Sequence, residues 1–324
     1  MEIVAGDIGG THARFALARI EQGRVVALDD PVTLRTTDHA SLPLAWAAFA
    51  ERIGRPLPRA AGIAIAAPIR GETLKLTNNS WVIRPATLAS DLHVDAVTLI
   101  NDFGAVGHAV AHAGPEHFVH IAGPDQPLPA DGVISIVGPG TGLGVAYLLR
   151  RDGRQFVVET EGGHLDFAPL DSVEEAILAR LRAKHRRVSA ERVVAGPGLA
   201  EIHATIAALE GQPVLAGDDK ILWTAAFDGS DPLATAALDR FCLSLGAVTG
   251  DIALAQGANA VVLAGGIGAR LKNHLPRSGF AGRFLAKGRY EAMMAAMPIK
   301  LITHPQPGLL GAVVAFAEQH GDRA

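Results

Sequence analysis

A glycine turn between two strand-like runs occurs twice in this chain, and this repetition constrains the fold more than any other feature. In each copy an apolar run leads into the turn, and a run with period-two alternation leaves it. The two Gly-Thr pairs, Gly10-Thr11 and Gly140-Thr141, lie 130 residues apart, and so do Gly23 and Gly153, which mark the next turn of each copy. Two landmarks at one offset indicate a duplicated unit. Each copy is predicted to be a meander of three antiparallel strands.

Beyond the two meanders, short apolar strands alternate with segments of helical periodicity. Further strands are predicted at 60–67, 96–100, 260–264 and 298–303, and helices at 41–53, 198–209, 232–256 and 308–320. A capping box from Ser172 to Glu175 predicts one more helix, which would run to about residue 187. This pattern predicts an α/β protein with two meander-led sheets, and 324 residues suffice for two domains. Residues 113–131, which hold four prolines, are predicted to connect the domains.

The composition excludes several classes of protein. A net charge of −4 gives no general attraction to nucleic acid or to anionic membranes, so neither is expected as a partner. A single cysteine, Cys242, excludes disulfides within the chain and cysteine-based zinc sites. No secretory signal is visible, and no apolar run reaches the roughly 18 residues needed to span a bilayer, so we expect a cytoplasmic protein. The basic run Arg180–Arg187 is interpreted as a solvated helix face rather than a binding patch.

The repeated turns are candidates for binding phosphate. Gly9 and Gly10 are expected to adopt positive φ and to let a ligand approach the backbone. Successive N–H groups, together with the Thr11 hydroxyl, would then form an anion-binding concavity. An ordinary glycine hairpin is the alternative for one turn, but two such turns suit a nucleotide whose phosphates are gripped from both sides. The sequence contains no P-loop motif, and the alternating glycines at 138–144 precede a strand, whereas a dinucleotide-binding fingerprint requires a helix there.

Only the first turn carries an acid. The offset of 130 residues places Val137 where the first copy has Asp7. Because Mg²⁺ retains several waters and takes few protein carboxylates, a single acid beside phosphates predicts a magnesium site at Asp7.

Asn101 and Asp102 follow a buried strand, at the end of a strand where open sheets bind their ligands. An aspartate at this point can act as general base toward a hydroxyl in phosphoryl transfer, with Asn101 orienting the same substrate. The alternative is that Asp102 caps the helix that follows. The residues alone do not decide between the two.

Two further glycine pairs carry candidate binding groups. Glu161 and His164 flank Gly162-Gly163, and a carboxylate and an imidazole in such a loop can bind neighbouring hydroxyls of a sugar. A metal pair is the alternative, although no further ligand stands at metal-binding spacing. Gly265-Gly266, which follows a strand, can admit the base or ribose of a nucleotide, or can serve close packing of a helix on that strand.

Seven motifs in a fixed order give the chain a family resemblance. Between residue 6 and about residue 268 they read GDIGGTHAR, LTNNSW, LINDF, VGPGTGLGVA, ETEGGHLDFAP, ERVVAGPGL and LAGGIG. Together they resemble the bacterial glucokinase family of sugar kinases, which have the two-domain actin-like ATPase (ribonuclease H-like) fold. The resemblance implies two α/β domains around an interdomain cleft: a small domain of residues 1–110 plus 305–324 and a large domain of residues 111–304.

The resemblance also implies an activity, the ATP-dependent phosphorylation of glucose at its 6-hydroxyl. It implies ATP and Mg²⁺ as cofactors, with Asp7 as the metal ligand, and a homodimer as the assembly. Asp102 resembles the family's general base, and the implied sugar ligands are Asn101, Asp102, Glu161, His164 and Glu191. Glu191 is implied by the resemblance alone, since its local pattern indicates a charge on a helix face. The implied nucleotide-binding residues form three glycine-rich groups: Gly6, Asp7, Ile8, Gly9, Gly10 and Thr11; Gly140, Thr141 and Gly142; Gly265 and Gly266.

The chain departs from its wider group in two places. His12 stands where many relatives carry Asn, so a contact from that side chain to the nucleotide is left open. Cys242 is the only cysteine, so the chain lacks the zinc motif common among repressor and kinase relatives, which favours the glucokinase branch.

Other functions on the same scaffold fit the sequence less well. A sugar-responsive regulator usually carries a helix-turn-helix ahead of its sugar domain, and here the glycine loop begins at residue 6. An actin-like structural or chaperone ATPase would explain the phosphate loops but not Glu161, His164 and Glu191 together. Within the kinases, the alternative substrate is another hexose, such as mannose or an amino sugar.

Overall fold

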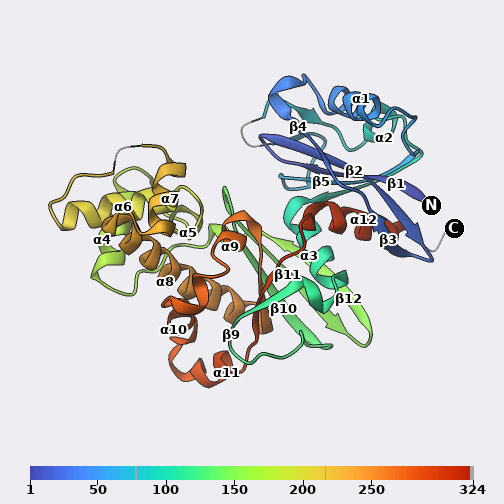
Figure 1. Ribbon diagram of the computed structural model, residues 1–324. Helices are drawn as coiled ribbons and strands as arrows, with labels where there is room; N and C mark the ends of the chain where they lie inside the picture. The colour runs from blue at the N-terminus through green and yellow to red at the C-terminus, as the bar shows by residue number, and fades with distance from the viewer. Residues whose placement is uncertain (77–78, 216, 322–324) are drawn as a thin grey trace. The chain divides into compact units, whose positions relative to one another are not determined.

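The chain divides into two compact units. The computed structural model describes residues 1–76, 79–215 and 217–321 (Figure 1), so Thr77 and Asn78 of the LTNNSW motif lie outside the described residues. Unit 1 comprises Met1–Gly114, Val157–Glu159 and His304–Ala324, and unit 2 comprises Pro115–Phe156 and Thr160–Thr303.

Unit 1 is built on a six-stranded sheet with the strand order β3-β2-β1-β5-β8, in which β4 also pairs with β2. These strands are β1 (Glu2–Ile8), β2 (His12–Glu21), β3 (Arg24–Leu28), β4 (Val32–Arg35), β5 (Ala60–Ile65) and β8 (Ala96–Asn101), and β6 (Leu74–Lys75) with β7 (Val82–Ile83) forms a separate hairpin. The helices are α1 (Leu42–Ile53), α2 (Leu88–Asp91), α3 (Asp102–His112) and α12 (Pro307–His320).

Unit 2 carries most of the second six-stranded sheet, with the order β12-β11-β10-β13-β14-β9, while Val157–Glu159 of the edge strand β12 count with unit 1. These strands are β9 (Phe118–Ala122), β10 (Gly132–Pro139), β11 (Leu143–Arg151), β12 (Arg154–Thr160), β13 (Ala258–Leu263) and β14 (Ile299–Ile302). The helices are α4 (Ser172–Arg182), α5 (Glu191–Val194), α6 (Gly198–Leu209), α7 (Asp219–Asp228), α8 (Pro232–Ala255), α9 (Gly265–Arg270), α10 (Phe280–Leu285) and α11 (Glu291–Ala295).

The predicted duplication is confirmed. Both meanders turn through the same backbone conformation, with φ values of 50° and 72° at Gln22 and Gly23 and of 53° and 73° at Asp152 and Gly153. In both sheets the first strand of the meander also pairs with a later strand in parallel, β1 with β5 and β10 with β13. A parallel strand follows in each case, β8 beside β5 and β14 beside β13. The repeat is therefore one of topology as well as of sequence pattern.

The expectation of positive φ at Gly9 and Gly10 is wrong, because neither residue adopts it. The Gly9 N–H donates to the His12 carbonyl at 2.9 Å, so the hairpin closes with Gly10 and Thr11 at its centre. A turn of this length can be built with negative φ at both central positions. The pairing registers of the two hairpins also differ by one residue, since Ile8 faces Ala13 whereas the equivalent Gly138 faces Gly144.

Two further predictions from the sequence need correction. The region 113–131 is not only a connection, because it contains β9, which pairs with β14 at the edge of the second sheet. Its prolines lie before and after the strand and not within it, so the number of prolines wrongly indicated a connection without a strand. Helix α4 ends at Arg182, and its N-cap is Asp171 rather than Ser172. The Asp171 carboxylate accepts the N–H groups of Val173 and Glu174 at 3.1 and 3.0 Å, which satisfies the first turn.

Helix α12 joins unit 1 although it lies at the far end of the chain. Leu309, Val313 and Phe316 on α12 are buried against Ile3 and Ala16 of the sheet. Two close backbone approaches explain why glycine is needed here: a Cβ at Gly62 would overlap the Ala312 carbonyl, and one at Gly311 would overlap the Ala105 carbonyl. The packing places the start of α12 beside the carboxyl end of β1.

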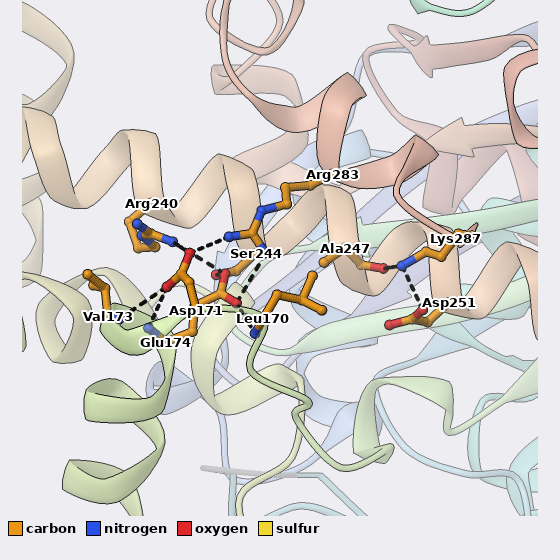
Figure 2. A network of polar contacts seen from close by, with 10 residues as sticks. All are labelled: Leu170, Asp171, Val173, Glu174, Arg240, Ser244, Ala247, Asp251, Arg283 and Lys287. Atoms are coloured by element: carbon orange, nitrogen blue, oxygen red, sulfur yellow. Dashed lines mark hydrogen bonds and ion pairs between the residues drawn. The ribbon is translucent and has the colours of Figure 1, made fainter. Parts of the chain in front are cut away.

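In unit 2 a buried polar network ties α4 to α8 and α10 (Figure 2). Glu174 is fully buried, and its carboxylate accepts from the Ser244 hydroxyl at 3.0 Å and pairs with Arg240 and Arg283 at 3.7 and 3.4 Å. The Asp171 carboxylate pairs with the same two arginines. Buried charges are tolerated only when they are paired and hydrogen-bonded, and this network meets that condition.

Among the described residues, no helix is long and apolar enough to cross a membrane.

Candidate functional site

Asp7 lies near the carboxyl end of β1, between a cation and a helix start. Its carboxylate pairs with Arg14 across the hairpin at 3.2 Å, and 21% of its side chain remains exposed. A Cβ at Gly308, in the first turn of α12, would lie only 3.0 Å from the Asp7 carboxylate. Burial raises the pKa of Asp7, while Arg14 acts in the opposite direction. The carboxylate is thus held beside the positive end of a helix dipole.

The first glycine turn, at Gly10 and Thr11, is fixed by hydrogen bonds that its carbonyl groups accept from Thr36. The Gly10 carbonyl accepts from the Thr36 hydroxyl at 2.7 Å, and the Thr11 carbonyl accepts from the Thr36 N–H at 3.0 Å. Within the part of the chain that the structure describes, the N–H groups of Gly10 and Thr11 donate no hydrogen bond, and Thr11 is exposed. Unused N–H groups in succession are what an anion-binding concavity requires.

Asn101 is the N-cap of α3, so the capping role considered for Asp102 belongs to its neighbour. The Asn101 side-chain oxygen accepts from the N–H groups of Phe103 and Gly104 at 2.9 and 3.2 Å. Its amide nitrogen donates one N–H to the Ala67 carbonyl at 3.1 Å, which leaves the second N–H of the amide. The asparagine is therefore oriented from both ends of its amide group.

Asp102 occupies the first helical position of α3 with its carboxylate largely buried. Burial, the charge of Asp7 and, to a lesser extent, that of Glu159 raise the pKa of Asp102 from 3.8 to about 6. The N–H of Phe103, which donates to this carboxylate at 2.9 Å, opposes part of that shift. A carboxylate with a pKa near 6 is ionised at neutral pH and still accepts a proton readily, which suits a general base.

Glu159 is a neighbour of this site that the sequence analysis did not single out. Its carboxylate accepts the Asn101 N–H at 3.2 Å, and a Cβ at Gly104 would overlap it. The only available signal was its position in the ETEGGHLDFAP motif, two residues before Glu161. The contact joins residues 58 positions apart, which local patterns do not reveal.

In unit 2 the turn that carries Glu161 and His164 lies on the start of β11. It is a 3₁₀ turn in which the His164 N–H donates to the Glu161 carbonyl at 2.9 Å. A Cβ at Gly163 would overlap the Leu143 carbonyl, and one at Gly162 would lie 2.9 Å from Val145. The two glycines therefore allow the turn to rest directly on the strand.

Glu191 also contacts the start of β11. Its carboxylate accepts the Leu143 N–H at 2.8 Å, and a Cβ at Gly142 would lie 2.5 Å from it. The structure thus brings together around Leu143 the second glycine turn, the turn of Glu161 and His164, and Glu191. The interpretation of Glu191 as a charge on a helix face is wrong, because its carboxylate is used in this contact.

The second glycine turn is also supported by the segments that contain Gly196 and Gly265. The Gly140 carbonyl accepts the Gly196 N–H at 2.8 Å. Gly265 has a φ of 79°, and a Cβ there would lie 2.6 Å from the Pro139 carbonyl, so this residue serves the close packing considered as its alternative role. Nothing lies within 4 Å of a Cβ built at Gly266, which leaves room there for a ligand.

The donor set for a metal ion is small. Among the described residues, no group of three or more His, Cys, Asp or Glu side chains is arranged to hold a metal. This excludes an all-protein cage in that part of the chain but fits Mg²⁺, which is often held by one carboxylate and by substrate phosphates. Asp7, with its single carboxylate beside the first glycine turn, suits that mode of binding.

Comparison with known proteins places this geometry in a family. The glucokinase family model matches residues 4–319. The glucokinase of Zymomonas mobilis is 62% identical over 322 residues, which cover 99% of each chain. The crystal structure of a glucokinase from an Antarctic psychrotroph has a TM-score of 0.84 at 30% identity and covers 98% of this chain and 99% of its own. A ROK family glucokinase from Streptomyces griseus, solved with glucose and AMPPNP, has a TM-score of 0.62 at 19% identity, with 97% and 98% coverage.

These matches confirm the resemblance found in the seven motifs and the predicted α/β fold of the actin-like ATPase type. The family model spans both meanders and both glycine turns. The chain belongs to the glucokinase family of enzymes.

Proposed function

We propose that this protein transfers the γ-phosphoryl group of ATP to the 6-hydroxyl of glucose, with Asp102 as the general base. The observation that carries the proposal is the Asp102 carboxylate, which lies at the junction of β8 and α3 with a pKa raised to about 6. Family membership supplies the substrates, since the Streptomyces griseus relative was solved with glucose and an ATP analogue.

In this mechanism Asp102 accepts the proton of the 6-hydroxyl as the oxygen attacks the γ-phosphorus in line. Above pH 6 the carboxylate is mostly ionised and ready to accept that proton. The remaining N–H of the Asn101 amide would donate to a sugar oxygen, because its other polar atoms already cap α3 and bind Ala67. This fixed amide would orient the sugar toward Asp102.

The remaining sugar hydroxyls would be bound by Glu161, His164 and Glu191. One carboxylate oxygen of Glu191 accepts the Leu143 N–H, so the other is available to a hydroxyl. Two acceptors and an imidazole distinguish hydroxyl orientations, because a mismatched hydroxyl would leave a polar group unpaired.

The glycine turns at 6–11 and 140–142 would bind the phosphates of ATP through their N–H groups, and Gly265-Gly266 would lie near the adenosine. Asp7 would be the protein ligand of Mg²⁺, which when bound supplies positive charge to the phosphate oxygens. Arg14 would keep the Asp7 carboxylate oriented through their ion pair.

Three coarser features complete the proposal. The domains would be residues 1–110 with 305–324 and residues 111–304, the assembly would be a homodimer, and the location would be cytoplasmic, where ATP is supplied. Light scattering would test the dimer, since a mass near 33.7 kDa would identify a monomer.

The test of the function is Asp102→Asn, assayed by coupled ATP consumption and by glucose binding. We expect kcat to fall by about 10²-fold or more, within the usual range for loss of a general base, while glucose still binds. Turnover at the wild-type rate would refute the assignment. Running wild type on glucose, mannose, fructose and N-acetylated sugars would identify another hexose if glucose were not preferred.

A further inference from the structure

The chain segments that lead away from His164 and into Glu191 are paired with each other. The Ala190 N–H donates to the Leu165 carbonyl at 2.7 Å, and the Phe167 N–H donates to the Val188 carbonyl at 3.1 Å. These bonds flank an isolated antiparallel bridge between Asp166 and Ser189. The pairing is short, with two backbone hydrogen bonds, yet it joins the two segments of unit 2 that carry proposed sugar ligands.

Arg187 bridges the two paired segments at the end nearest His164. Its Nε donates to the Asp166 carboxylate at 2.6 Å, and its Nη2 donates to the His164 backbone carbonyl. The guanidinium is a rigid planar fork, so it fixes the two acceptors relative to each other in a way that a lysine ammonium does not. Arg187 thus binds the backbone of His164, and it precedes Glu191 by four residues in the chain, so it links the two segments that carry these residues.

The contact is too exposed to be explained as a stabilising ion pair. The Arg187 and Asp166 side chains are 59% and 75% exposed, and ion pairs of this kind contribute only about 0–1 kcal/mol to stability. Two other cations of the basic run are used differently, since Arg180 and Lys184 both pair with Glu201 on α6. Arg187 lies beyond the end of α4 at Arg182, so it does not belong to the helix face first assigned to it.

We propose that Arg187 is a positioning residue of the sugar site, which holds the His164 turn in register with Glu191. The inference rests on the proposed function, because it takes His164 and Glu191 as ligands of the same sugar. Arg187 acts through the His164 carbonyl and touches no reacting atom. Loss of the fork frees the turn to shift, and small misplacements of binding groups weaken recognition strongly.

The experiment measures glucose binding by calorimetry and steady-state kinetics in Arg187→Gln, with Arg186→Gln as the matched control. Arg186 is exposed, and the structure shows no contact for its guanidinium among the described residues. We expect Arg187→Gln to weaken glucose binding and raise the glucose KM about tenfold, with the ATP KM changed less than twofold. Equal effects in the two variants would overturn the proposal, as would equal effects on the two KM values.

A double-mutant cycle separates this inference from the proposed function. His164→Ala alone should weaken glucose binding; if it does not, the role proposed for His164 fails whatever Arg187→Gln does. If Arg187 acts through the His164 turn, adding Arg187→Gln to His164→Ala should weaken glucose binding by clearly less than tenfold, because coupled residues are not additive and only Glu161 remains on the turn as a ligand that can be misplaced. A further tenfold loss in that background would overturn the positioning role. Arg187→Lys should recover only part of the binding, and full recovery would show that charge alone suffices.

Discussion

The raised pKa of Asp102 predicts that Asp102→Asn stabilises unit 1, although the same substitution is expected to lower kcat by about 10²-fold or more. Asparagine has nearly the same shape, and its side-chain oxygen can still accept the Phe103 N–H that bonds to the carboxylate at 2.9 Å. What the substitution removes is a negative charge that is largely buried and repelled by Asp7 and Glu159. Functional sites often retain such unfavourable groups because the chemistry needs them.

The magnitude follows from the pKa of Asp102, which is raised from 3.8 to about 6. Each pKa unit corresponds to about 1.4 kcal/mol, so ionisation of Asp102 costs the folded unit about 3 kcal/mol above pH 7. Between about pH 4 and pH 6 the folded state binds the proton more tightly than the unfolded state, so stability falls as the pH rises through this window. Asp102→Asn removes this loss, and its advantage should shrink to about 1 kcal/mol at pH 4.5.

The assay follows unit 1 alone, because a chain with two compact units need not unfold in one step. Hydrogen exchange of peptides from α3 is measured against urea concentration at pH 7.5 and pH 4.5. Asp95→Asn is the control, because hydrogen bonding and charge from Arg59 lower the pKa of Asp95, so its loss should give no gain. An Asp102→Asn variant no more stable than wild type at pH 7.5, or equally stabilised at both pH values, would refute the reasoning.

Three further predictions concern the proposed mechanism and the packing that supports it. The kcat/KM for glucose should rise about tenfold per pH unit at low pH and level off above about pH 7, because Asp102, with its pKa raised to about 6, must be ionised; a flat profile from pH 5 to pH 8 would contradict this. Glu174→Gln should destabilise unit 2 by about 3 kcal/mol in urea unfolding, because it leaves the two arginines of the buried network with the single carboxylate of Asp171, whereas the exposed Glu175→Gln should change stability by less than about 0.5 kcal/mol. Gly163→Ala should destabilise unit 2 by about 1–3 kcal/mol and raise the glucose KM more than the ATP KM, since the new methyl group would overlap the Leu143 carbonyl; an unchanged glucose KM would argue that this turn does not bind the sugar.

The sequence was most informative where a pattern is local and periodic. The two meanders were predictable because alternation and the turn residues Gly23 and Gly153 are read directly from neighbouring positions. Strand β9 was not, since only five residues between prolines form it and its partner β14 lies far along the chain. The register difference between the hairpins was equally hidden, because it depends on pairing and not on composition.

The site was predictable in its residue types but not in its contacts. Asp102 was a candidate from its place at the end of a strand, yet its pKa depends on Asp7 and Glu159, which lie far from it in sequence. Capping was considered as an open alternative for Asp102, whereas Asn101 provides the cap; both residue types cap helices well, and only the backbone shows which one precedes the first turn. Glu191 needed the resemblance, since its contact with Leu143 spans 48 residues.

The two copies of the duplicated unit differ chemically at equivalent positions. At equivalent places on the first strand of each meander, unit 1 has Asp7, partly exposed beside Arg14 and the start of α12, and unit 2 has Val137, fully buried in the core. In unit 2 a carboxylate reaches the turn from outside the hairpin, because Glu191 on α5 accepts the Leu143 N–H. Asp7 therefore lies within the strand, where its carboxylate can meet a cation beside phosphates. Glu191 instead binds the backbone of the turn and keeps one carboxylate oxygen available to a hydroxyl. Under the proposed function, the same topology would therefore supply the metal ligand Asp7 in unit 1 and the sugar ligand Glu191 in unit 2, each from a different place around its glycine turn.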